Sequence, residues 1–464
     1  MMSRPWTELH GPDEESAAYT KKLIALGAVI VGKTKMTSFA SPEEATDQWI
    51  DFHCPVNPRG DRYQSPSSSS TGAGTSLAGY SWLDFSVAGD SAGSVRAPAP
   101  CSRLFSLRPS FNSTSMEGIP VNSSYESSDA PTSPCLFLCI FSTLANPPNR
   151  EFDAVGHFAR NLRDHHYIVS HTFENIPQNF SKFPSKILYP LEFYPLKNSK
   201  QQDLTEEFVA ILEEFLGVKR TPFSFVEEWE KSPPKQAEAL PLLKYTEKSA
   251  FWALCYDYYH GFDVFRDDYK ANFGKDAFTS SVVRFRWDVG KQVTPEEYDE
   301  YLRQLEVFRE WFSKRFMRPD SESLSSAILV MPYGEPDPEY RDEPTLSRSP
   351  AGTFPTIAEK FISPILHAPQ LVLPFAQMPY FSRISGRDEV RPIASTLIGA
   401  KGSDLMLIEL AIAAFKKASW PTTIQTGCYM YPLASNSRNV SRRSTTAPGP
   451  TIGSRVKLNG FAEI

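Results

Sequence analysis

The sequence predicts an α/β protein. Short apolar runs such as AILVMP at 327–332 and LVLPF at 371–375 have the length and composition of buried strands. Between and after them lie amphipathic helical patterns, and the last of these, GSDLMLIELAIAAFKKASW at 402–420, has lysines near its C-terminal end, where the helix dipole favours cations. Strands that alternate with helices are typical of α/β folds.

Composition excludes several functional classes. A chain of 464 residues with 41% hydrophobic residues can bury a full core, as one large domain or two to three smaller ones. A net charge of −6 gives no reason to expect a nucleic acid as partner. No apolar run reaches the length of a membrane span, and the six scattered cysteines fit a reducing compartment. We therefore expect a cytoplasmic protein without metal or cofactor, and the sequence does not indicate its oligomeric state.

The N-terminal region predicts a helix over 14–26, ended by Gly27, and then a short buried strand over 28–31. The run from Gly27 to Thr34 also matches the phosphate-loop pattern G-x-x-x-x-G-K-[ST]. A phosphate loop needs its strand before the first glycine and open backbone amides between the glycines. Here the predicted strand itself fills that space, so we do not expect nucleotide binding.

Two hydroxyl-rich segments follow about two dozen residues apart. The first is the serine cluster at 67–70, and the second is GDSAGSVR at 89–96. The intervening SLAGYSWLDFSVA predicts a short helix and then a strand, which would bring the second segment back beside the first. This arrangement suits a serine nucleophile that is assisted by a second serine.

The second segment allows another assignment. Residues 89–93 also match G-x-S-x-G, the nucleophile elbow of α/β-hydrolases, which would make Ser91 the nucleophile. An elbow requires a helix directly after it, and Pro98 and Pro100 stand where that helix would need backbone donors. We therefore favour a nucleophile elsewhere in the segment.

At these residues the chain resembles the amidase signature family, in particular its fungal members, which carry similar NPRGD…SPSSSSTG and GDSAGSVR motifs. The likeness extends from about Glu15 to Tyr431. It implies the amidase signature fold, a central mixed β-sheet covered by helices on both faces, as a single domain over 1–431. Residues 432–464 are basic and poor in apolar residues, and we expect them to be a disordered tail.

The resemblance also implies a catalytic site. It assigns the nucleophile to Ser94 and the bridging serine, which the family holds on a cis peptide bond, to Ser70. The backbone amides of three residues would line the oxyanion hole, and three further side chains would fix the loop. The amides are those of Ser91, Ala92 and Gly93, and the loop-fixing side chains are Thr71, Asp90 and Arg96.

The motif departs from the family pattern at several positions. Ser68 and Ser69 stand where two glycines are usual, Gly89 replaces a threonine, and Ala92 replaces a glycine. Losing glycines restricts the backbone wherever a positive φ is required.

The family's general base is a lysine in a V-K-D-like motif, on a strand before the segment that matches GAVIVGKT. This chain shows no such motif there, and on spacing alone none of Lys21, Lys22, Lys33 and Lys35 takes its place. Two explanations stay open, an N-terminal segment missing from the sequence or a degenerate relative.

The middle of the chain contains an irregularity. By resemblance Pro120 should lead within a few residues to Glu151, but about thirty residues intervene, from 121 to 150. They represent either a translated intron or a surface insertion. From about 150 to 320 the pattern is helical, and an aromatic stretch at 249–273 is either simple core or a wall of the acyl pocket. We do not expect His165, His166 and His260 to bind a metal.

Two functions follow from these observations. The first is an amidase-type serine hydrolase that cleaves an amide or ester bond of a small molecule, and the fungal likeness points to a secondary metabolite. The second is an inactive amidase-like protein that uses the fold for binding. The missing lysine favours the second, and the retained serines favour the first.

Overall fold

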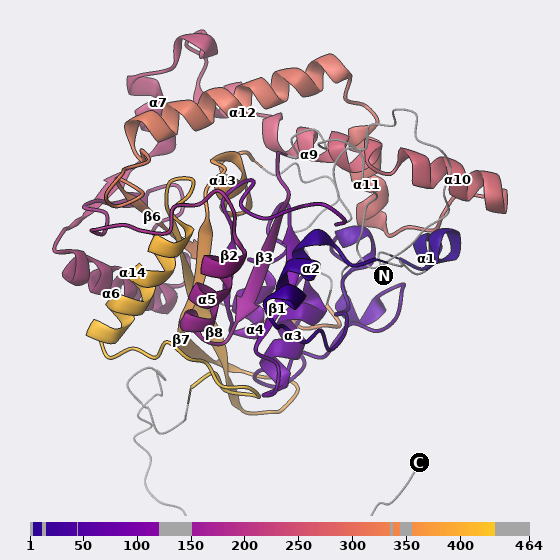
Figure 1. Cartoon of the computed structure of the whole chain (residues 1–464), viewed down its shortest axis with the longest axis horizontal. Helices are drawn as coiled ribbons and strands as arrows, with labels where there is room; N and C mark the ends of the chain where they lie inside the picture. The colour runs from indigo at the N-terminus through magenta and orange to yellow at the C-terminus, as the bar shows by residue number, and fades with distance from the viewer. Residues whose placement is uncertain are drawn as a thin grey trace, which may run out of the picture.

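The computed structural model describes residues 3–11, 15–43, 45–119, 151–334, 337–343 and 355–431. The predicted insertion at 121–150 and the tail at 432–464 lie outside these residues. The described part is built on one mixed sheet of eight strands in the order β1-β3-β2-β7-β8-β6-β4-β5 (Figure 1). The strands are β1 (Phe85–Asp90), β2 (Phe105–Arg108), β3 (Ala154–Ala159), β4 (Ile187–Pro190), β5 (Arg220–Phe223), β6 (Ile328–Tyr333), β7 (Gln370–Phe381) and β8 (Asp388–Ile398).

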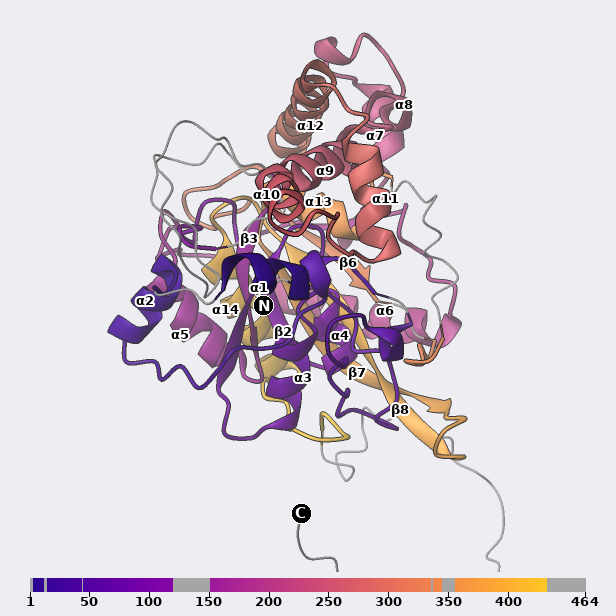
Figure 2. The same ribbon diagram turned by 90° about the vertical axis from the view of Figure 1, so that its right-hand side faces the viewer.

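The sheet is antiparallel except at one edge. Strand β4 runs parallel to both β5 and β6, and the other pairings are antiparallel. Strands β7 and β8 form the longest pair, from Gln370 opposite Ile398 to Phe381 opposite Asp388. This pair extends beyond the other strands as a two-stranded ribbon (Figure 2).

Helices cover both faces of the sheet, as predicted. Fourteen α-helices lie in the described part: α1 (Arg4–His10), α2 (Ala18–Ala25), α3 (Thr71–Gly79), α4 (Pro98–Ser102), α5 (Leu162–Thr172), α6 (Ser199–Leu216), α7 (Phe225–Lys231), α8 (Leu242–Tyr245), α9 (Ser249–His260), α10 (Asp263–Phe273), α11 (Ser281–Gly290), α12 (Pro295–Arg315), α13 (Glu359–Ile365) and α14 (Asp404–Lys417). On one face α5, α6 and α14 pack together (Figure 1). On the other, α3 and α4 lie against the sheet, and α7 to α12 form a separate helical layer beyond one end of it (Figures 1 and 2).

The residues of β6 show how the sheet separates two apolar cores. Ile328 and Val330 belong to the core beneath α5, α6 and α14, whereas Leu329 and Met331 belong to the core beneath α12 and α13. Successive side chains of a strand point to opposite faces, so one short apolar run contributes to both cores.

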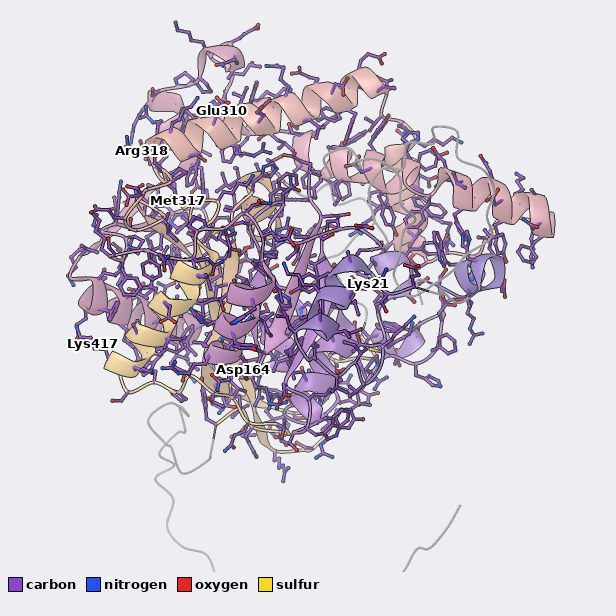
Figure 3. The ribbon with its side chains drawn as sticks, in the orientation of Figure 1. Lys21, Asp164, Glu310, Met317, Arg318 and Lys417 are labelled. Atoms are coloured by element: carbon purple, nitrogen blue, oxygen red, sulfur yellow. The ribbon has the colours of Figure 1, made fainter. Side chains whose placement is uncertain are left out.

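The helix ends follow local sequence signals. Helix α12 begins with a capping box, in which the Thr294 side chain accepts from the Glu297 amide and the Glu297 side chain accepts from the Thr294 amide. Helix α14 ends at lysines, and Lys417 lies at that end (Figure 3), where its ammonium donates to the Glu214 carbonyl at 3.0 Å.

The N-terminal region differs from its prediction. Helix α2 begins at Ala18 instead of residue 14 and has no acidic residue in its first turn. Residues 28–31 are not a strand, and they are not buried: Val29 is 83% and Val31 61% exposed. The apolar run has no partner strand in the described part of the chain. With helix α2 before it, the segment also lacks the strand that a phosphate loop requires.

Candidate active site

The nucleophile loop begins where β1 ends. Asp90 is the last residue of β1, residues 91–94 turn away from the sheet, and α4 follows from Pro98. Gly93 has a φ of +113°, and a Cβ there would lie 2.9 Å from the Tyr333 hydroxyl oxygen. Both the backbone conformation and the close contact require glycine at this position. The helix at Pro98 was not expected, but prolines at the start of a helix lose no intrahelical hydrogen bond.

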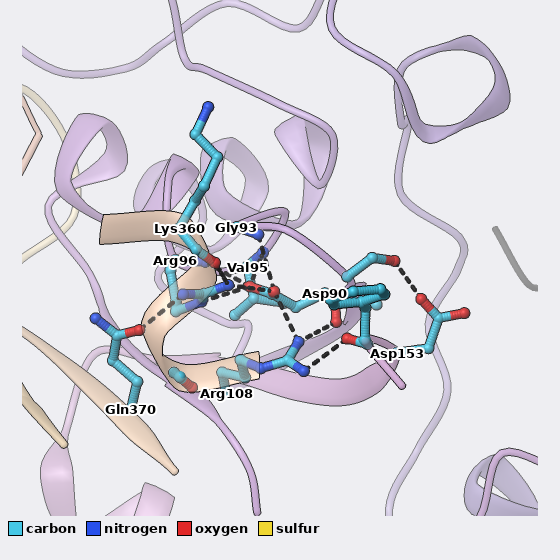
Figure 4. Close-up of polar contacts among 12 residues, drawn as sticks. Asp90, Gly93, Val95, Arg96, Arg108, Asp153, Lys360 and Gln370 are labelled. Carbon is cyan, nitrogen blue, oxygen red and sulfur yellow. Dashed lines mark hydrogen bonds and ion pairs between the residues drawn. The ribbon is translucent and has the colours of Figure 1, made fainter. Parts of the chain in front are cut away.

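The Asp90 carboxylate fixes this loop (Figure 4). Its Oδ1 accepts from the Gly93 amide at 2.9 Å, and its Oδ2 accepts from the Val95 amide at 3.0 Å. Two buried guanidinium groups pair with it: Arg96 Nη2 lies 2.8 Å and Arg108 Nη1 2.9 Å from Oδ1. Arg96 continues the network to Gln370, at 2.7 Å. Asp90 and Arg96, which the resemblance expects to fix the loop, thus make these contacts, and Arg108 is a further member that no sequence motif indicated.

Charge pairing decides the ionisation of Asp90. Burial alone would raise the pKa of this carboxyl group, but the guanidinium groups of Arg96 and Arg108 and the hydrogen bonds to the loop hold it well below its ordinary value. Asp90 is therefore ionised throughout the physiological range.

The serine cluster lies beside this loop. The Ser70 amide donates to the Ser94 carbonyl at 3.3 Å, so the two hydroxyl-rich segments meet as predicted. Thr71, the first residue of α3, donates its hydroxyl to the Ser67 carbonyl at 2.8 Å and closes the turn that leads into the helix.

The cis peptide bond falls between Ser68 and Ser69, not at Ser70 as predicted. The Ser70 hydroxyl donates to the Gly89 carbonyl at 3.4 Å. Ser69, by contrast, lines the cavity onto which Ser94 opens, and Ser70 is not among the lining residues. Four consecutive serines carry no signal for register, so the sequence alone could not show which of them follows the cis bond.

The cavity has a volume of about 440 Å³. Its floor includes Ser94, Ala92 and Gly93 from the nucleophile loop, together with Ser69. Helix α9 contributes an apolar wall: its lining side chains are Phe251, Leu254 and Tyr258. The aromatic stretch at 249–273 thus supplies both core residues and part of the cavity wall. Tyr333, Arg286, Lys360 and Arg391 also line the cavity, and no sequence motif had pointed to them.

The predicted oxyanion hole is only partly compatible with the structure. The Gly93 amide donates to Asp90 and is therefore committed within the loop. The expected set of three amides, from Ser91, Ala92 and Gly93, needs this correction, because a carboxylate at the base of a turn attracts the nearest N–H groups. Ala92 lines the cavity and needs no positive φ, so its replacement of a glycine imposes no strain.

Ser91 has a different environment from Ser94. Its hydroxyl forms a short hydrogen bond to the carboxylate of Asp153, the residue directly before β3. This contact uses the Ser91 hydroxyl inside the loop (Figure 4). The geometry therefore favours Ser94 over the G-x-S-x-G assignment.

The four lysines upstream of Ser70 lie away from the cavity wall. Lys21 pairs with Glu15 at 2.6 Å, and Lys22 pairs with Glu174 at 2.7 Å. Lys35 donates to the Met36 carbonyl at 2.8 Å, and burial lowers its pKa while Asp51 and Glu43 act in the opposite direction. Within the described residues, Lys360 on α13 is the lysine that lines the cavity, and a Cβ at Gly93 would lie 3.8 Å from its Cβ.

Two kinds of feature are absent from the described residues. No group of three or more histidine, cysteine, aspartate or glutamate side chains is arranged to hold a metal ion. Among the helices of the described ranges, none combines the length and apolar character needed to cross a membrane.

Comparison with known proteins shows consistent matches. The chain is 38% identical over 103 residues to a glutamyl-tRNA(Gln) amidotransferase component of Sulfolobus acidocaldarius, covering 22% of this chain and 21% of that protein. Amidase 1 of Oryza sativa is 25% identical over 194 residues, covering 42% of this chain and 38% of its own length. The chain thus spans about a fifth to two fifths of the curated relatives it matches.

Solved structures show the same fold at low identity. A bacterial aryl acylamidase of the amidase signature family superposes with a TM-score of 0.61 and 15% identity, covering 90% of this chain and 78% of that one. A 6-aminohexanoate cyclic dimer hydrolase superposes with a TM-score of 0.59 and 14% identity, covering 88% and 78%. The Amidase family model matches residues 7–407. The chain therefore belongs to the amidase signature family.

Proposed function

We propose that this protein is a serine hydrolase that cleaves an amide or ester bond of a small molecule, with Ser94 as its nucleophile. The observation that carries the proposal is the position of Ser94: it opens onto a cavity of about 440 Å³ from a loop that a buried carboxylate and two guanidinium groups hold rigid. A fixed nucleophile at the floor of a concave site is what acyl transfer requires. Family membership supports the same reaction class.

The reaction proceeds through an acyl-enzyme. Ser94 Oγ attacks the carbonyl carbon of the substrate and loses its proton, and the tetrahedral intermediate collapses when the C–N or C–O bond breaks and the leaving group takes up a proton. Water then attacks the ester formed on Ser94 and releases the acid. Ser69 is our proposal for the bridging serine that relays the proton, in place of Ser70, because Ser69 lines the same cavity.

The proton acceptor is not among the upstream lysines in this proposal, because none of Lys21, Lys22, Lys33 and Lys35 lines the cavity in the described part of the chain. Lys360 lines the cavity, so Lys360→Met is the first variant with which to test a lysine as proton acceptor. The position of the four upstream lysines away from the cavity also favours the second candidate function. In that case the protein is amidase-like, binds a small molecule in this cavity and does not turn it over.

Labelling with a fluorophosphonate probe separates the two functions. We expect the purified full chain to react with the probe, the Ser94→Ala variant to lose the reaction, and the Ser91→Ala variant to keep it. Ser91 is the matched control because it lies in the same loop and its hydroxyl is held by Asp153. Absence of labelling in the unmodified chain would contradict the proposal of a hydrolase. A binding protein would then be the remaining candidate function.

The pathway and the compartment stay predictions from the sequence. The apolar wall on α9 supports a substrate with an apolar acyl group, which suits a small fungal metabolite. A cytoplasmic location remains our expectation.

A further inference from the structure

Three buried arginines meet at a second, much smaller cavity beside the active site. Arg59, Arg103 and Arg391 line it, and their side chains are 2%, 1% and 7% exposed. Its volume is about 10 Å³, and it shares Cys101, Arg391 and Pro392 with the large cavity. Arg391 therefore lies between the two cavities.

Two of these arginines are held by neutral acceptors. Arg59 donates to the carbonyls of Ser102, Gln425, Gly427 and Tyr429 at 2.7–3.3 Å. Arg103 donates to Gln377 Oε1 and to the Cys428 carbonyl, both at 2.8 Å, and to the Val390 carbonyl. These bonds position the guanidinium groups, but none of the acceptors carries a compensating negative charge.

Each arginine also keeps one donor without a partner. Arg59 Nη2, Arg103 Nε and Arg391 Nη1 are buried nitrogens with no hydrogen-bond acceptor among the described residues. A buried cation that lacks both a counter-ion and a full set of acceptors is costly, and a guanidinium does not escape that cost by losing its proton at neutral pH. Three such groups at one small cavity indicate a missing anionic partner.

No aspartate or glutamate of the described residues lines the small cavity, and two carboxylates next to it in the sequence are engaged elsewhere. Asp61 accepts from the Tyr63 amide, from Gln64 Nε2 and from the Ser382 hydroxyl at 2.7–3.0 Å. Glu389 pairs with Arg387 at 2.9 Å. Burial lowers the pKa of Arg103 to about 10, an effect that the Tyr380 phenol opposes and Arg391 strengthens. The protein thus supplies little of the charge that these arginines need.

We propose that this small cavity binds a monatomic inorganic anion, a halide such as chloride, coordinated by Arg59, Arg103 and Arg391. The small volume, about 10 Å³, favours an anion of a single atom over a carboxylate or a phosphate. The positive charge of the three guanidinium groups favours an anion over a neutral water in this cavity. This site is separate from the proposed chemistry at Ser94 and does not depend on it.

The anion has a structural role in this proposal. Arg59 and Arg103 bind carbonyls at 425, 427, 428 and 429, so they hold the C-terminal end of the described chain against the turn at 57–62. Neutralising the two guanidinium groups removes their mutual repulsion and stabilises this junction. Occupancy by halide should therefore raise the melting temperature of the whole protein.

The test compares salts at constant ionic strength. The purified full chain is dialysed into sodium gluconate, whose anion is too large for the cavity, and sodium bromide then replaces the gluconate stepwise. We expect a saturable rise in Tm of about 3 °C once bromide exceeds its Kd a hundredfold. Crystals grown in bromide should show an anomalous scattering peak between the three arginines.

Variants separate the site from general salt effects. Arg391→Met removes one cation whose Nη1 has no partner, so we expect a Tm in gluconate equal to or above that of the unmodified chain, and no bromide response. Arg62→Met is the matched control, because Arg62 is exposed on the same turn, and it should keep the full response.

Two results would overturn the proposal. One is an equal bromide response in the unmodified chain and in Arg391→Met, which would make the effect non-specific. The other is a cavity without an anomalous peak in bromide-grown crystals, which would mean that it holds water, bridging the arginines to the unpartnered Gln64 Oε1.

Discussion

Ser69 and Ser70 are adjacent in the chain, but of the two it is Ser69 that lies on the cavity wall. The Ser70 hydroxyl is directed at the Gly89 carbonyl, 3.4 Å away. At the scale of single residues, function in this loop depends on which of several chemically identical side chains faces the cavity. The backbone decides this, and composition does not reveal it.

Substituting these two serines separately tests the assignment. We expect Ser69→Ala to slow fluorophosphonate labelling of Ser94 by roughly 10²–10⁴-fold, the range for losing a positioned proton-transfer group. Ser70→Ala should change the rate by less than about threefold, because it removes one long hydrogen bond to a carbonyl. Rate constants measured by quenched gel fluorescence provide the comparison, and the reverse order would restore Ser70 as the bridging residue.

Asp90 is the residue on which the geometry of the loop depends most. Asp90→Asn should lower the free energy of unfolding by about 3–5 kcal/mol, because it leaves the buried Arg96 and Arg108 without their counter-ion. Urea unfolding measures this loss, with the exposed Asp388→Asn as control. Since the folded-state pKa of Asp90 is depressed, its contribution is complete above the unfolded pKa of about 4 and is lost on acidification below it. An unchanged urea midpoint in Asp90→Asn would contradict the role of Asp90 as counter-ion of Arg96 and Arg108.

At the scale of elements, α9 combines two roles. Phe251, Leu254 and Tyr258 line the cavity, while Asp257 on the same helix is 1% exposed. Burial, with repulsion from Asp153, raises the pKa of Asp257 to about 8, and the Tyr298 hydroxyl acts in the opposite direction. Asp153 also accepts a hydrogen bond from Ser91. The charge of Asp257 is therefore coupled to the nucleophile loop through the Asp153 carboxylate.

This pKa predicts an unusual dependence of stability on pH. Between the unfolded pKa of about 4 and the folded pKa of about 8, the folded state binds one proton more than the unfolded state at Asp257. Its contribution to stability therefore falls as pH rises through this window and is constant above it. We expect Asp257→Asn to be more stable than the unmodified chain at pH 8 and to lose this advantage at pH 5. Thermal melts at several pH values measure the difference, and a gap that does not change with pH would refute the assignment.

The described part of the molecule is organised by its sheet, which separates the two largest apolar cores. Because neighbouring residues of β6 serve different cores, we propose that the described elements unfold as a single domain. Ile328→Ala and Leu329→Ala, on opposite faces, should each destabilise by about 2–5 kcal/mol and shift the same single transition. Tryptophan fluorescence reports eight tryptophans, among them Trp229 and Trp311 in one core and Trp420 packed against the other, and its transition should coincide with that of circular dichroism. Two separate transitions in either variant would indicate independent domains.

Prediction from the sequence succeeded where the signal is local. The strand at Ile328–Tyr333, the final helix at Asp404–Lys417 and the helical character of residues 150–320 follow from periodicity and apolar runs. The fold itself followed from the resemblance carried by residues 57–96. Strand β8 was missed, because a polar beginning and Pro392 conceal its pairing with β7.

Prediction failed where the outcome depends on distant partners. An apolar run at 28–31 predicts a buried strand only if another strand lies beside it, and the described part of the chain provides none. Arg59 and Arg103 meet Arg391 across most of the length of the sequence, and Lys360 reaches the cavity from a helix without any motif. Such encounters arise from the fold, which local patterns do not encode.

The exposed segment at 28–31 also affects how the protein behaves in concentrated solution. A short run of β-branched residues on a surface, with Val29 and Val31 largely exposed, readily pairs with its copy in another molecule. Charged residues flank the run on both sides: before it Lys21 and Lys22 form ion pairs with Glu15 and Glu174, and Lys33 follows it. Such charged flanks oppose pairing, because an intermolecular sheet would have to strip water from them. None of these lysines lines the active-site cavity, so we expect their acetylation to promote aggregation before it alters the active site.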